Sequence, residues 1–137
     1  MTRPDAASHR RAATSPAGGL LTALRVLAGL SMLTFLYMGA TAGEIFSQAQ
    51  PWLFLHGVGA IVLHVLTGLT AAAALLVQRS TGGSMVPVVV AGTVFVLTFV
   101  QALLGTLATL WMHIPLALLL LLSLAWVLSW SFSPARR

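Results

Sequence analysis

The chain has 137 residues, of which 58% are hydrophobic and only 7% are charged. A water-soluble domain normally carries about 25% charged residues, so this composition excludes a soluble fold and indicates an integral membrane protein. The net charge of +5 comes from seven arginines, and in a membrane protein such charge sets orientation and does not indicate nucleic-acid binding. Because there is no cysteine, disulfides, thiolate metal sites and covalent c-type haem are excluded as well.

Residues 1–19 are polar, basic and rich in Ala, Ser, Pro and Gly, which predicts a disordered tail, and residues 134–137 form a second, short basic tail. Residues 20–133 contain four apolar segments, each about as long as the 20 residues that a helix needs to cross a bilayer. We therefore expect an all-α fold, an integral membrane four-helix bundle. The predicted spans are Leu20–Ala42, Trp52–Val77, Met85–Leu110 and His113–Phe132.

The connections between these spans differ in length. A polar, glycine-rich turn at residues 78–84 separates the second span from the third. Only Trp111 and Met112 separate the third span from the fourth, so Pro115 is expected in the first turn of the fourth helix, where its missing N–H costs little.

All seven arginines fall on one side of this four-span topology. The positive-inside rule assigns that side to the cytoplasm. We therefore predict a multi-pass protein of the cell membrane with both termini cytoplasmic and the lipid bilayer as its surroundings.

The two halves of the sequence show a weak likeness. The first and third spans share the triplet LTF, at Leu33–Phe35 and Leu97–Phe99, and the second and fourth spans both carry a histidine near their starts, at His56 and His113. These matches are compatible with a parallel duplication of two helical hairpins. Apolar sequences also match by chance, so both explanations stay open.

His56 and His113 are the first candidates for a cofactor site. Both are expected near the outer ends of their spans, at equivalent places in the two halves. Two neutral imidazoles from different helices of a bundle are a recurrent way to hold the iron of b-type haem. The alternative is that each is an interfacial histidine bonded to a backbone carbonyl.

His64 is a weaker candidate for haem binding. It lies eight residues after His56, about 12 Å deeper and some 80° around the helix, near the middle of the membrane. A polar side chain there should face the bundle interior. It is interpreted first as a structural residue bonded to a neighbouring helix, with Gln101 of the third span as one suggested partner. A second haem ligand, a quinone contact and a proton relay are the sharper alternatives.

Two segments of the chain resemble a known family. The segment Val100–Leu124 resembles the second hairpin of one half of a haem A synthase, where a Gln-x-x-x-Gly span precedes a helix that begins near a histidine. Leu55–Leu69 is similar to the histidine-bearing second helix of such halves. The chain also resembles small actinobacterial four-helix membrane proteins with Leu-His near the start of helices two and four.

The resemblance covers roughly residues 20–132 and implies a four-helix bundle in which His56 and His113 bind haem. The haem A synthase half with the oxidising site has an acidic residue shortly before the second-helix histidine. Here the nearest acid is Glu44, twelve residues upstream of His56. The resemblance therefore implies haem binding and does not extend to haem A synthesis.

We expect a membrane protein that binds haem b near the outer face through two histidines, for electron transfer or haem handling. Its partners would be a redox protein, a larger membrane complex or further copies of the chain, and no nucleic acid. A haem-free structural or accessory subunit is the alternative, and a small transporter is the third. Enzymatic activity stays open, because no phosphate-binding loop, nucleophile elbow or carboxylate pair indicates a reaction.

Overall fold

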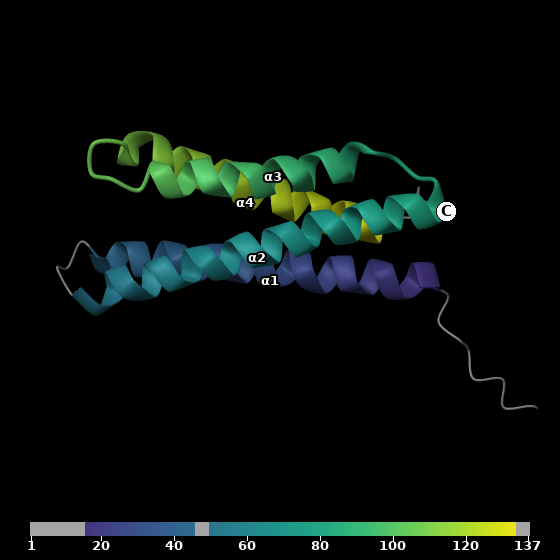
Figure 1. Ribbon diagram of the computed structural model, residues 1–137, viewed down its shortest axis with the longest axis horizontal. Coiled ribbons are helices and arrows are strands. Elements are labelled where there is room, and N and C mark those ends of the chain that lie inside the picture. The colour runs from purple at the N-terminus through teal and green to yellow at the C-terminus, as the bar shows by residue number, and fades with distance from the viewer. Residues whose placement is uncertain (1–15, 46–49, 134–137) are drawn as a thin grey trace, which may run out of the picture.

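The computed structural model describes residues 16–45 and 50–133, and this part of the chain forms four helices and no strand (Figure 1). The expected all-α fold is confirmed, and each helix is long and apolar enough to cross a membrane. The helices are α1 (Pro16–Ile45), α2 (Gln50–Thr81), α3 (Val86–Leu103) and α4 (Leu110–Phe132).

Most of the two predicted tails lies outside the residues that the structure describes. Residues 1–15 and 134–137 lie outside them. Pro16–Gly19, which the sequence pattern places in the first tail, belong to α1, so that predicted boundary is wrong. A proline is well accommodated at the start of a helix because its missing N–H has no intrahelical partner there.

The two hairpins α1–α2 and α3–α4 lie side by side as two layers (Figure 1). α1 packs on α2 and α4, and α3 packs on the same two helices, so α1 and α3 are diagonal, as are α2 and α4. The start of α1, the α2–α3 turn and the end of α4 meet at one end of the bundle, here called the arginine end because it holds Arg25 and Arg79 (Figure 1). The opposite end, which holds His56 and His113, is called the histidine end.

The α2–α3 turn forms where the polar segment predicts it. Gly82 adopts a left-handed φ of 65° and its N–H donates to the Gln78 carbonyl at 2.8 Å. This is the usual way in which a glycine ends a helix, because only glycine enters that region without steric cost.

The α3–α4 connection differs from the prediction. α3 ends at Leu103 and α4 begins at Leu110, so residues 104–109 form the link and Trp111 lies inside α4. The Thr109 hydroxyl donates to the Leu104 carbonyl at 2.7 Å, which satisfies backbone that the break in the helix leaves free. Pro115 is consequently the sixth residue of α4 and lies in its second turn. The link is nearly as apolar as the helices, which is why hydropathy did not reveal it.

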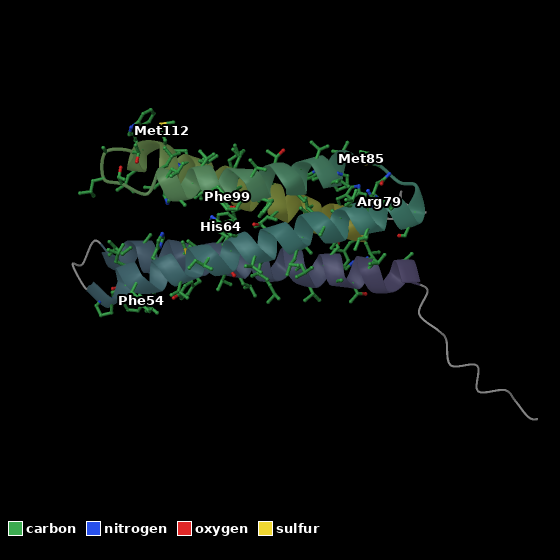
Figure 2. All side chains as sticks on the ribbon, viewed as in Figure 1. Phe54, His64, Arg79, Met85, Phe99 and Met112 are labelled. Atoms are coloured by element: carbon green, nitrogen blue, oxygen red, sulfur yellow. The ribbon has the colours of Figure 1, made fainter. Side chains whose placement is uncertain are left out.

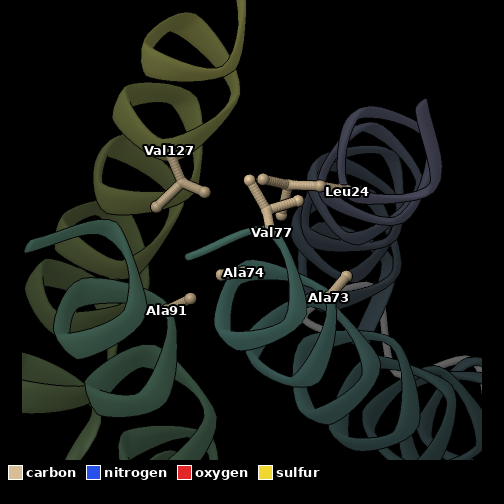
Figure 3. Close-up of a cluster of buried hydrophobic side chains, with 6 residues drawn as sticks. All are labelled: Leu24, Ala73, Ala74, Val77, Ala91 and Val127. Atoms are coloured by element: carbon tan, nitrogen blue, oxygen red, sulfur yellow. The ribbon is translucent and has the colours of Figure 1, made fainter. Parts of the chain in front are cut away.

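Two clusters of buried apolar side chains fill the interior. One joins all four helices near the arginine end, where small alanines let the helices approach closely (Figure 3). The other lies toward the middle of the bundle. The first cluster contains Leu24, Ala73, Ala74, Val77, Ala91 and Val127, and the second contains Phe35, Leu63, Val94, Leu120 and Leu124.

Helices α1 and α4 are joined at the arginine end by Arg25. Its guanidinium donates to the Ser131 carbonyl, from Nη2 at 2.8 Å and from Nε at 3.3 Å, and lies 4.2 Å from the centroid of the Phe132 ring. The carbonyls of the last helical turn have no intrahelical donor and carry partial negative charge. Arg25 therefore caps α4 and ties it to α1.

Candidate functional site

His56 is held by the helix that precedes it in its own hairpin. Its Nδ1 lies 3.0 Å from the hydroxyl oxygen of Thr41 on α1, and that hydroxyl donates its only proton to the Met38 carbonyl at 3.1 Å. With the Thr41 proton donated to Met38, Nδ1–H of His56 is the donor to the Thr41 oxygen in this tautomer. In the neutral imidazole this leaves the lone pair on Nε2.

His113 is held in the same way in the second hairpin. Its Nδ1 lies 3.0 Å from the backbone carbonyl of Gln101 on α3, and because a carbonyl only accepts, Nδ1 carries the proton. The Gln101 side-chain amide donates in return to the His113 carbonyl at 2.7 Å. This reciprocal pair of bonds fixes the ring and again leaves the lone pair on Nε2.

Both histidines line one cavity of about 390 Å³ at the histidine end. Its sides are α1 and α4, and the other two helices, α2 and α3, contribute His56, Leu63 and Gln101. The rim is apolar and faces outward, since Leu36 of α1 is 57% exposed and Leu118 of α4 is 58% exposed. A ligand would thus enter between α1 and α4 from the lipid.

Small residues of α1 keep this cavity open. Gly39, Ala42 and Gly43 line it, and a Cβ built at either glycine meets nothing within 4 Å. Arg25 ties α1 to α4 at the arginine end. At the histidine end, the small side chains of α1 leave space between the same two helices.

His64 lies outside this cavity. Figure 2 shows it on α2 toward Phe99 of α3, with ring centroids 4.3 Å apart and ring planes at 71°. Its Nδ1 is buried without a hydrogen-bond partner among the described residues. The suggested bond to Gln101 does not form: the Gln101 amide nitrogen donates to the His113 carbonyl, and Gln101 Oε1 and His64 Nδ1 both lack a partner among the described residues. The structure therefore brings His56 and His113 to one cavity and leaves His64 apart.

Thr41 and Gln101 complete the arrangement, and sequence reasoning missed their part in it. Thr41 precedes His56 by 15 residues and Gln101 precedes His113 by 12, so each holds the histidine from the other helix of the hairpin. A search for polar residues at the same depth in the preceding span would have found both.

This donor set suits a ligand bound by imidazole lone pairs. The described residues contain no group of three or more metal-ligating side chains, so they offer no cage for a bare metal ion. Haem iron needs only axial ligands from the protein, and metal-binding histidines commonly donate their second ring N–H to a carbonyl or similar acceptor. The residues of the cavity thus fit haem chemistry.

Comparisons with protein-family models, with curated proteins and with solved structures gave no match. The helices themselves define the class: the chain is a multi-pass, four-helix membrane protein.

Proposed function

We propose that this protein binds b-type haem in the cavity at the histidine end, where His56 and His113 would hold the iron, for electron transfer or haem handling. Bound haem would supply a one-electron redox couple at its iron. The observation that carries the proposal is that both histidines line one cavity with Nδ1 engaged in a hydrogen bond. Each ring is therefore held with Nε2 as the nitrogen available to iron.

The surroundings of the two histidines support this proposal. Thr41 is 2% exposed and Gln101 is 7% exposed, so the bonds that orient the rings are sheltered from water. Apolar side chains around the cavity would exclude solvent from a macrocycle.

The orientation in the membrane belongs to the same proposal. The positive-inside rule makes the arginine end cytoplasmic, which puts the cavity in the outer leaflet of the cell membrane. A topology reporter fused after Arg137 should then be active only in its cytoplasmic form. Activity of a periplasmic reporter at that position would contradict the orientation.

A haem-free structural or accessory subunit is the second candidate function. It is favoured by the fact that each histidine already has a hydrogen-bond partner inside its own hairpin. A small transporter receives less support. Glu44 lies in the last turn of α1, and cation export needs an acid deep in the membrane.

Absorption spectra of the detergent-purified protein distinguish haem binding from the haem-free alternative. Oxidised and dithionite-reduced samples, as purified and after addition of hemin, should show the bands of low-spin b-type haem. His56→Ala and His113→Ala should each remove or alter these bands, and the control His64→Ala should leave them unchanged. The absence of a Soret band after hemin addition would refute the proposal.

A further inference from the structure

One polar atom of the cavity has no partner in the hairpins. Oε1 of Gln101 is buried and accepts no hydrogen bond among the described residues, although the amide nitrogen of the same side chain is bonded to His113. A carbonyl oxygen left unpaired away from water is costly, and far more so within a membrane. Because Gln101 is only 7% exposed and lines the cavity, a ligand in the cavity is in a position to supply the missing donor.

The histidine nitrogens that face the cavity are acceptors as well. The Nδ1–H groups of His56 and His113 are already donated to Thr41 and Gln101, so each ring offers only the Nε2 lone pair. The Thr41 proton is donated to Met38. Among the described residues the cavity therefore presents the Gln101 Oε1 and the Nε2 lone pairs of the two histidines as acceptors, against one remaining hydrogen, the second N–H of the Gln101 amide.

The size and lining of the cavity define the rest of the ligand. Its volume of about 390 Å³ is many times the roughly 30 Å³ that one water molecule occupies in the liquid, so a single bridging water does not fill it. Its lining is mainly apolar, and its rim at Leu36 and Leu118 opens to lipid. The described residues place no arginine at this end to pair with an anion. A neutral, lipid-soluble molecule with more than one O–H donor matches these features.

We propose that the cavity of the haem-free protein binds a lipid-soluble hydroquinone, whose hydroxyl groups donate to Gln101 Oε1 and to a histidine Nε2. The oxidised quinone has carbonyl oxygens in place of the hydroxyls. It has no O–H to donate and would leave Gln101 Oε1 unpaired, so the cavity favours the reduced form. This inference does not depend on haem binding. Because both ligands use the same histidines, they exclude one another.

The test is calorimetric titration of the haem-free protein in lipid nanodiscs under anaerobic conditions, with empty nanodiscs as the blank. The probes are tetramethylhydroquinone, its dimethyl ether and tetramethylbenzoquinone, which share one ring and differ in their O–H donors. Each lost hydrogen bond in a sheltered site lowers affinity by about 10-fold. The hydroquinone should therefore bind at least about 10-fold more tightly than the ether or the quinone. Equal affinity for the three probes, or no binding of the hydroquinone, would overturn the proposal.

Two variants locate the binding site. Gln101→Met removes the acceptor at similar size and should weaken hydroquinone binding by about 10-fold while leaving the ether unchanged. Gly39→Leu fills the cavity and should abolish binding of the hydroquinone, with Gly29→Leu as the matched control. Both glycines lie on α1 with open space where a Cβ would be added, and only Gly39 lines the cavity. Binding that survives Gly39→Leu would place the ligand elsewhere and refute the inference, even if Gln101→Met fails to fold.

The two proposals fail separately. A Soret band together with no hydroquinone binding by the haem-free protein would leave haem ligation standing and overturn this inference. Hydroquinone binding without any Soret band would refute haem ligation and leave this inference standing. Where both ligands bind, saturation with hemin should abolish the hydroquinone signal. An undiminished signal would show that the two sites are distinct, and Gly39→Leu then decides between the proposals: loss of hydroquinone binding in that variant overturns the placement of haem in the cavity, and retained binding overturns this inference.

Discussion

Replacing Arg25 with methionine should loosen the junction of α1 and α4. Methionine keeps most of the aliphatic length of arginine, so packing of the stem is largely preserved. What it removes is the pair of bonds to the Ser131 carbonyl, at 2.8 Å and 3.3 Å, and the contact with Phe132 at 4.2 Å. The last turn of α4 then lacks a donor at its boundary.

The size of the effect follows from these contacts. A hydrogen bond from a charged donor contributes about 1.5 to 3 kcal/mol, and the 3.3 Å bond adds little to the 2.8 Å bond because both share one acceptor. A partly exposed cation–π contact contributes about 0.5 kcal/mol. Arg25→Met should thus lower the free energy of unfolding by about 2 kcal/mol.

Reversible unfolding in mixed detergent micelles, followed by circular dichroism, measures this change. Arg79→Met is the matched control, since it removes the same charge from an exposed position at the same end. It should alter stability by less than about 0.5 kcal/mol. In a double-mutant cycle, Arg25→Met and Phe132→Leu should show a coupling of about 0.5 kcal/mol. An effect of Arg25→Met no larger than that of the Arg79 control would refute the capping role.

The histidine end and the α1–α2 interface give further predictions. Thr41→Val keeps the shape of the side chain and removes the acceptor for His56, so it should weaken hemin binding by about 10- to 100-fold in a spectrophotometric titration. Unchanged hemin affinity would show that this bond does not position the ring. Gly59→Val should lower the free energy of unfolding by about 1 to 3 kcal/mol, because a Cβ there would lie 2.5 Å from Met38 Sδ. The control Gly57→Val has open space at its Cβ and should have a smaller effect. Equal melting shifts for the two valine variants would contradict the close packing at Gly59.

The membrane class, the number of helices and the placement of both described chain ends at one end of the bundle followed from the sequence. Composition and span length are sufficient for these features, because a bilayer admits few backbone structures. The boundary between α3 and α4 was not predicted from the sequence. Leu104, Leu107 and Ala108 are as apolar as a span, so hydropathy continues across a break that depends on the local bonds of Thr109.

The candidate site was predictable only in part. Depth and topology were enough to bring His56 and His113 together, and both line the same cavity. The part played by Thr41 depends on which face of α1 meets α2, which an apolar sequence does not reveal. The unpaired Oε1 of Gln101 depends on one side-chain rotamer. Such features appear only when atoms are placed.

The pairing of α1 with α4 has a consequence for biogenesis. The two sides of the cavity are the first and the last helices of the bundle, so the site does not exist until the final span has entered the membrane. A nascent chain with three spans has Thr41 and His56 in place but lacks His113 and one side of the cavity. A ligand of this cavity would therefore be loaded only after the last span has inserted, and the lipid-facing rim at Leu36 and Leu118 would admit it from the bilayer.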